Sequence, residues 1–211
     1  MYVSIYRSIT VFFVLLFVTG LPWHSVRADD RPVLLVLGDS LSAAHNIELN
    51  ESWVALLQGR LEKHNASYRV INASVSGDTS RTALTRLQKK LTQYNPELCL
   101  VELGGNDGLQ GLPASELKSN LLEIISLCGH TARHVLLFEI LIPMNYGPVY
   151  RDRLMAVYQQ LGSMDDVSLV PFFMHDVIGQ PGMMQADGIH PSAQAQPLLL
   201  DKVWNVLELL L

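Results

Sequence analysis

The sequence has few cysteines, few charged residues and no excess of basic side chains. Two cysteines among 211 residues are too few for a small domain held together by disulfides. Charged residues make up 17%, with 20 acidic and 15 basic side chains, so the formal net charge is −5. Nucleic-acid binding needs a basic surface, so we expect no nucleic-acid partner. Apolar residues make up 49%, which excludes a disordered chain.

No apolar run reaches the roughly 20 residues that a membrane-spanning helix requires. The clearest run, Ile9–Val18, is about half that length and follows Arg7. A basic start, a short apolar core and a small residue at Ala28 predict a secretory signal peptide over residues 1–28, with an uncleaved membrane tether as the alternative. Cleavage removes two arginines and no acid, so the remaining domain, residues 29–211, carries −7. We expect this domain to be periplasmic or secreted.

Both cysteines, Cys99 and Cys128, belong to the exported domain. An oxidising compartment would permit a disulfide between them. Cys99 stands in an apolar run typical of a strand, however, and Cys128 stands near the end of a helical pattern. Free buried cysteines are common. We therefore expect two free thiols, with a disulfide as the alternative.

Short apolar runs alternate with longer helical patterns along the domain. Apolar residues at consecutive positions are typical of parallel strands that are covered on both faces. Five such runs occur, at Val33–Leu37, Tyr68–Ile71, Leu98–Leu103, His134–Ile140 and Ser168–Val170. Helical spacing follows each of them, over Ser52–His64, Thr79–Tyr94, Ser115–Cys128, Val149–Leu161 and the tail Ser192–Leu211. This alternation predicts an α/β fold, a single three-layer α/β/α sandwich with a five-stranded parallel sheet.

Polar residues follow the predicted strands, where ligands bind in such sheets. Ser40 follows the first strand, Gly77 the second and Asn106 the third, while Asp187 and His190 stand in the last loop. Each has an ordinary alternative: a helix cap for the serine and aspartate, a turn for the glycine and asparagine, and a loop position for the histidine. Together they supply the nucleophile, backbone donor, amide donor and acid–base pair of a serine acyl hydrolase.

These motifs resemble those of the SGNH (GDSL) hydrolase family. The matching segments are Gly38–Ser42, Ser76–Thr79, Gly104–Asp107 and Asp187–Pro191, and the resemblance extends in order over essentially the whole domain. It implies a flavodoxin-like sandwich in which Ser40 is the nucleophile, His190 is the general base and acid, and Asp187 orients His190. It also implies an oxyanion hole formed by the Ser40 N–H, the Gly77 N–H and the Asn106 side-chain amide.

The resemblance further implies acyl substrates: small-molecule esters, thioesters or lysophospholipids, with transient contact to membrane lipid. Five residues are candidates for substrate binding: Leu109, Gln110, Pro143, Met144 and Tyr146. By the same resemblance the loop over residues 108–113 borders the acyl groove and is mobile. His45 and Gln110 depart from the family pattern, which leaves the acyl-chain preference open. We expect a monomer.

Three other interpretations remain. A carbohydrate-ester deacetylase would share the fold and the catalytic residues. A non-catalytic exported binding protein would share only the fold, and it would have no need of Ser40, Asp187 and His190 together. Asp39, Asp187 and His190 could also ligate a metal. Three such ligands are few for a metal site, so we expect neither a metal nor another cofactor.

Overall fold

Five parallel strands form one sheet in the computed structural model, which describes residues 29–211. The predicted signal peptide, residues 1–28, lies outside the described residues. Within the described part of the chain, no helix is both long enough and apolar enough to cross a membrane. The strands are β1 (Val33–Gly38), β2 (Arg69–Asn72), β3 (Leu98–Glu102), β4 (His134–Phe138) and β5 (Val167–Val170).

The spatial order of the strands is β2-β1-β3-β4-β5, and every neighbouring pair is parallel. Strands β1 and β3 are buried along their whole length, because each has a strand on both sides and helices over both faces. Such strands are apolar at consecutive positions. The predicted five-stranded parallel sheet is therefore confirmed.

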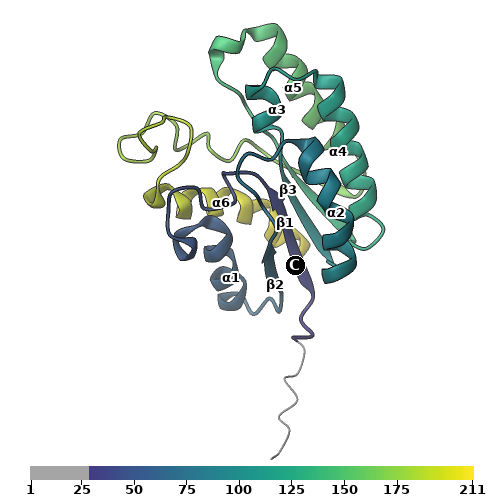
Figure 1. The fold of residues 1–211 in the computed structure, drawn as a ribbon. Helices are drawn as coiled ribbons and strands as arrows, with labels where there is room; N and C mark the ends of the chain where they lie inside the picture. The colour runs from purple at the N-terminus through teal and green to yellow at the C-terminus, as the bar shows by residue number, and fades with distance from the viewer. Residues whose placement is uncertain (1–28) are drawn as a thin grey trace, which may run out of the picture. The chain divides into compact units, whose positions relative to one another are not determined.

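Helices cover both faces of the sheet, as Figure 1 shows. The helices are α1 (Trp53–Lys63), α2 (Ser80–Tyr94), α3 (Gly105–Leu109), α4 (Ala114–Cys128), α5 (Pro148–Leu161) and α6 (Gln196–Leu207). Short 3₁₀ turns add η1 (Leu49–Glu51), η2 (Met144–Tyr146), η3 (Ala193–Ala195) and η4 (Glu208–Leu210). Helices α1 and α6 pack on one face, and α2, α4 and α5 pack on the other.

Alternate residues of the same strand enter opposite cores. Leu34 and Val36 of β1 pack with α1 and α6, whereas Leu35 and Leu37 pack with α2, α4 and α5. Side chains of a strand point to opposite faces in turn, so an unbroken apolar run feeds both cores at once. The three-layer α/β/α sandwich follows from that pattern.

One element differs from the sequence prediction. No helix was predicted after β3, where a turn was one of two interpretations, but the segment forms the short helix α3. Gly104 initiates it with φ of +116°, and a Cβ atom there would lie 2.0 Å from the Tyr158 hydroxyl oxygen. Local Gly and Asn signals predict a change of chain direction but do not distinguish a turn from a one-turn helix.

The two cysteines are buried and free, as favoured from the sequence. Cys99 lies in β3, and Cys128 is the last residue of α4. A hydrogen bond with the Cys128 side chain, together with burial, raises the pKa of the Cys99 thiol. The Cys99 thiol therefore stays protonated and unreactive at neutral pH.

Candidate active site

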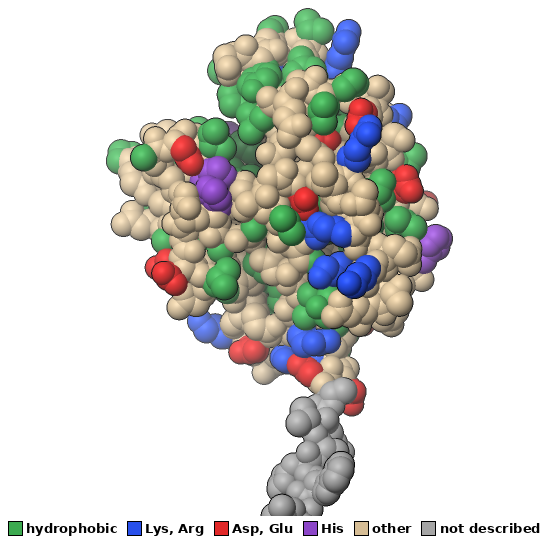
Figure 2. All heavy atoms as spheres, in the orientation of Figure 1, with side chains coloured by type: hydrophobic (Ala, Val, Ile, Leu, Met, Phe, Trp, Pro, Cys, Tyr) green, Lys and Arg blue, Asp and Glu red, His purple; other side chains and the backbone are tan. Residues whose placement is uncertain are grey.

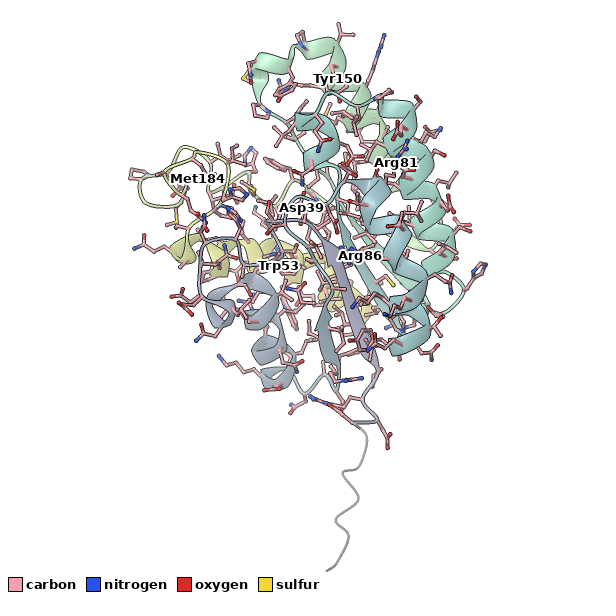
Figure 3. All side chains as sticks on the ribbon, viewed as in Figure 1. Asp39, Trp53, Arg81, Arg86, Tyr150 and Met184 are labelled. Atoms are coloured by element: carbon pink, nitrogen blue, oxygen red, sulfur yellow. The ribbon has the colours of Figure 1, made fainter. Side chains whose placement is uncertain are left out.

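The carboxyl ends of the strands and the long loop before α6 enclose a cavity of about 520 Å³. Figure 3 shows Asp39 at the end of β1 and Met184 on the loop, and both contribute to its wall. The volume lies in the range of small-molecule sites. Most of its wall is apolar, with Leu109, Ile142, Phe172, Met174, Ile178 and Ile189 among the lining residues. Figure 2 shows hydrophobic side chains around a recess on this face of the molecule.

Ser40, His190 and Asp187 form a continuous hydrogen-bonded chain at this cavity. The Ser40 Oγ lies 2.9 Å from the His190 Nε2, and the His190 Nδ1 lies 2.7 Å from an Asp187 oxygen. The other Asp187 oxygen accepts hydrogen bonds from the backbone N–H groups of Ile189 and His190. These bonds hold the pKa of Asp187 well below its usual range. An ionised Asp187 accepts the Nδ1 proton, which leaves Nε2 free to accept the proton of Ser40.

Hydrogen bonds within the last loop fix the histidine in place. The backbone N–H of Gln185 donates to the His190 carbonyl at 2.8 Å, and Met184 forms an isolated bridge with Pro191. The Gln185 side chain donates to the carbonyls of His45 and Pro191 at 2.8 and 3.0 Å. This side chain therefore ties the histidine loop to His45 in the turn after β1, which is 140 residues away in sequence.

The turn that carries Ser40 is fixed from several directions. A Cβ atom on Gly38 would lie within 2.9 Å of Ser42 and Glu102, so the close approach there requires glycine. The Ser42 hydroxyl donates to the Glu102 carboxyl group at 2.8 Å. The indole N–H of Trp53 donates to the Leu41 carbonyl at 3.2 Å. Ser40 therefore stands on a turn whose backbone is held on both sides of it.

The three predicted oxyanion donors differ in their present hydrogen bonding. The backbone N–H groups of Ser40 and Gly77 make no hydrogen bond within the described part of the chain. Both hydrogens of the Asn106 amide are used, because Nδ2 donates to Asp39 Oδ2 at 3.1 Å and to the Asp78 carbonyl at 2.9 Å. Asn106 lines the cavity. Among the described residues, the Ser40 and Gly77 N–H groups thus have no acceptor, whereas both hydrogens of the Asn106 amide already have one.

Two acids are buried beneath Ser40: Asp39, which the sequence analysis considered only as a metal ligand, and Glu102, which it did not single out. Asp39 and Glu102 are both almost inaccessible to solvent, and the Glu102 Oε2 accepts the Asp39 N–H at 3.4 Å. Burial raises the pKa of Asp39 to about 6, and burial next to Asp39 raises the pKa of Glu102 well above its usual range. A glutamate at the end of an otherwise apolar strand was the signal for this pair.

The five candidate substrate residues do not all reach the cavity. Leu109, Pro143 and Met144 line it, whereas Gln110 and Tyr146 lie outside its lining. The Tyr146 hydroxyl instead donates to the Leu109 carbonyl at 2.8 Å and so supports a residue that does line it. Mobility of the 108–113 loop stays a prediction.

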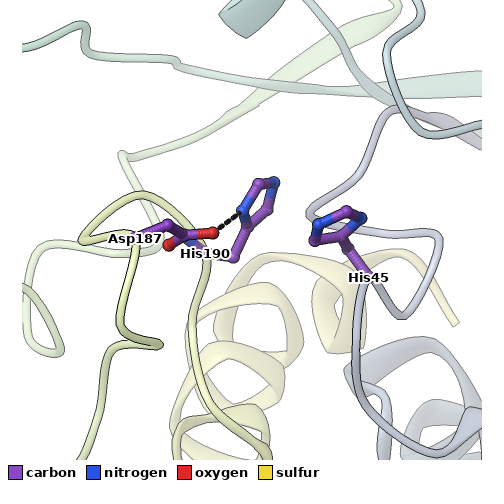
Figure 4. Close-up of side chains that lie close together, drawn as sticks. All are labelled: His45, Asp187 and His190. Carbon is purple, nitrogen blue, oxygen red and sulfur yellow. Dashed lines mark hydrogen bonds and ion pairs between the residues drawn. The ribbon is translucent and has the colours of Figure 1, made fainter.

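A second imidazole, that of His45, stands beside the His190 ring. His45 and His190 have ring centroids 4.1 Å apart and planes inclined by 31°. His45, Asp187 and His190 each offer one ligand atom, and these atoms lie within 4.8 Å of one another, as the close-up in Figure 4 illustrates. His45, rather than Asp39, is thus the third side chain at this place that could ligate a metal. No other such group occurs among residues 29–211.

A serine, a histidine and an aspartate in hydrogen-bonded succession at the carboxyl edge of a parallel sheet define a serine hydrolase with an α/β/α fold. Comparison with known proteins gives the family. The chain belongs to the GDSL-like lipase/acylhydrolase family, which it matches over residues 36–197. The resemblance noted from the motifs is thereby confirmed.

Several relatives cover most of the chain. It is 48% identical to the esterase TesA of Pseudomonas aeruginosa, over 84% of this chain and 89% of that protein. It is 42% identical to the thioesterase 1/protease 1/lysophospholipase L1 of Escherichia coli, over 88% and 86%. Among solved structures, a crystal structure of TesA superposes with a TM-score of 0.82 at 47% identity, covering 85% of this chain and 99% of that one. The psychrotrophic esterase EstA of Pseudoalteromonas superposes with 0.79 at 40% identity, covering 83% and 96%.

Proposed function

We propose that this protein hydrolyses esters and thioesters of fatty acyl groups through an acyl-enzyme on Ser40. One observation carries the proposal: the Ser40–His190–Asp187 chain, with separations of 2.9 and 2.7 Å, opens onto an apolar cavity. A hydroxyl group needs a neighbouring base to act as a nucleophile, and that base needs a third group to orient it. Both requirements are met at one place.

The reaction proceeds in two halves. His190 accepts the proton of Ser40 as the serine oxygen attacks the acyl carbonyl carbon, and ionised Asp187 stabilises the imidazolium that forms. His190 then gives the proton to the leaving alcohol or thiol as the bond to the acyl group breaks. In the second half, water loses a proton to His190 and attacks the acyl-enzyme. His190 returns that proton to Ser40 when the acid leaves.

The negative charge on the carbonyl oxygen needs donors placed in advance. The N–H groups of Ser40 and Gly77 are two such donors, and their lack of another partner in the described chain supports this role. The Asn106 amide is the third donor in this proposal. It lines the cavity, and it reaches the oxyanion when it releases one of its present acceptors, Asp39 or the Asp78 carbonyl.

Apolar acyl chains suit the cavity better than sugars do, because most of its lining side chains are hydrocarbon. Met144, Ile178 and Ile189 line it and are also exposed, by 80%, 52% and 45%. Such an apolar rim supports transient contact with a lipid surface or a lysophospholipid. The names of the relatives, an esterase and a thioesterase/lysophospholipase, favour the same substrates over acetylated carbohydrates.

We further propose that the domain acts as an exported monomer and needs no cofactor. The basic start and short apolar core of residues 1–28 support export. N-terminal sequencing of protein recovered from the cell envelope measures the cleavage site. A mature protein that still begins at residue 1 would contradict cleavage of the signal peptide. Light scattering on the purified domain measures the oligomeric state.

A serine-directed fluorophosphonate tests the proposed nucleophile. The wild-type protein should be labelled on Ser40 and should lose hydrolysis of p-nitrophenyl, acyl-CoA and lysophospholipid substrates. Ser40→Ala should fold, take no label and be inactive. Ser163→Ala, at an exposed serine whose hydroxyl donates to Gln160, is the matched control and should behave as wild type. Hydrolysis retained by Ser40→Ala would reject the assignment.

A further inference from the structure

His45 changes the chemistry that is open to the catalytic histidine. Its imidazole lies beside that of His190, with ring centroids 4.1 Å apart, while Asp187 bonds His190 from the other side. Figure 4 shows the three side chains in this order. His45 comes from the turn after β1, whereas the other two come from the loop before α6. All three are at least partly accessible to solvent.

Two imidazoles and one carboxylate are a ligand set for zinc and its neighbours. Catalytic and other open zinc sites use three protein ligands and leave a fourth position for water. Imidazole also suits copper and nickel, whereas magnesium and calcium require oxygen ligands. The chemistry of this cluster therefore selects borderline transition ions and rejects the alkaline-earth ions.

The three ligand atoms must move slightly closer together to bind a zinc ion. Ligand atoms of a tetrahedral zinc ion stand about 3.4 Å apart, given zinc–ligand bonds of about 2.0–2.1 Å. The three ligand atoms here lie within 4.8 Å of one another before any ion binds. The His45 ring has one side-chain hydrogen bond, to the exposed Asn46 at 3.1 Å. The proposed adjustment is a rotation of that ring, which breaks only the bond to Asn46.

We propose that His45, Asp187 and His190 form an inhibitory site for a zinc-class divalent cation, which switches the hydrolase off. The inference rests on the proposed function of His190 as the general base. An ion on Nε2 would occupy the lone pair that accepts the Ser40 proton. An ion on Nδ1 would displace Asp187 as its partner and leave the proton on Nε2. Either mode removes the base, because only a neutral Nε2 without a proton can accept one.

The chain contains a comparison pair that isolates the part played by His45. On the surface, the His175 Nδ1 lies 2.9 Å from an Asp176 oxygen, much as His190 lies from Asp187. Among the described residues that pair belongs to no group of three ligands. A single histidine–aspartate pair gives two ligands, and His45 supplies the third at the catalytic pair.

Buffered free Zn²⁺, added to a p-nitrophenyl ester assay, tests the proposal. Zinc should lower the wild-type rate at least tenfold, EDTA should restore it, and Mg²⁺ should have no effect. His45→Phe keeps an aromatic ring beside His190 but offers no ligand. Relative to its own metal-free rate, this variant should need at least tenfold more zinc for the same inhibition. His175→Phe is the matched control and should be inhibited like wild type.

Calorimetry separates this inference from the proposed function. Zn²⁺ titrated into the inactive Ser40→Ala protein should bind with one ion per chain. Adding His45→Phe should weaken that binding at least tenfold, whereas adding His175→Phe should not. Equal binding by the His45→Phe and parent proteins would overturn the metal site, even if the enzyme is active. A His45-dependent zinc site in a wild-type protein without hydrolase activity would overturn the proposed function and leave only the metal site.

Discussion

Replacing Asp187 with asparagine tests how far hydrolysis depends on the tautomer of His190. One oxygen of Asp187 accepts the Ile189 and His190 backbone N–H groups at 2.9 and 3.0 Å. The asparagine carbonyl oxygen can take over both bonds, so the loop should keep its conformation. The asparagine NH₂ group then faces the His190 Nδ1 in place of the second carboxylate oxygen, 2.7 Å away in the wild type.

The substitution exchanges an acceptor for a donor at Nδ1. That nitrogen must then accept, so the proton moves to Nε2, which donates to the Ser40 oxygen and no longer accepts from it. In serine proteases the equivalent change lowers kcat about 10⁴-fold. We expect a loss of the same order here, about 5 kcal/mol of transition-state stabilisation.

Steady-state kinetics with a p-nitrophenyl ester measures the loss, and the ¹⁵N chemical shifts of His190 report which nitrogen carries the proton. Thermal unfolding should show little change in Tm. Asp176→Asn is the matched control, because Asp176 pairs with the exposed His175 and with Lys202 outside the cavity lining. It should change kcat less than twofold. A kcat for Asp187→Asn within tenfold of wild type would refute the proposed role of Asp187.

Three further predictions concern the oxyanion hole, a buried acid and a glycine. Asn106→Ala should lower kcat about 10²–10³-fold with a smaller effect on KM, as measured by ester hydrolysis, and an unchanged kcat would remove its amide from the oxyanion hole. Because burial raises the pKa of Asp39 to about 6, the folded state holds its proton more tightly than the unfolded state, and the stability this contributes is lost as the pH rises. Relative to Asp39→Asn, urea titrations should show the wild-type free energy of unfolding falling by about 2 kcal/mol between pH 4 and pH 7, and a rise would contradict the assignment. Gly104→Ala should lower the free energy of unfolding by about 2 kcal/mol or more, because its Cβ would clash with the Tyr158 hydroxyl at φ of +116°, whereas Gly59→Ala in α1, where a Cβ meets nothing within 4 Å, should be neutral or stabilising.

Much of the fold was predictable, because strand and helix periodicities are local properties of the sequence. The ends of the elements were predicted less well. The strand run at His134–Ile140 was expected two residues longer than β4, which ends at Phe138. Helix α3 was not predicted at all. Its five residues, Gly105–Leu109, are too few to show a period, and the close approach of Gly108 to Ile142 is a tertiary contact that local signals do not report.

The candidate site was predictable in part. Serine, glycine and asparagine at strand ends are local signals, and parallel strands place their carboxyl ends on one edge. Gln110 and Tyr146 lie outside the cavity lining, although Leu109 and Met144, one and two residues before them in sequence, lie in it. Neighbours on a short helix or turn point in different directions, so sequence proximity alone does not place a side chain in a cavity.

The sequence by itself determined the alternation of strands and helices, the motifs at the strand ends and the family to which they point. The tertiary structure decided which side chains meet. Ser40 and His190 are 150 residues apart, and only the folded loop before α6 brings them within 2.9 Å. The same convergence sets His45 against His190 and buries Glu102 beneath Ser40. Distances and desolvation belong to the packed molecule, because they arise from segments that the chain order keeps apart.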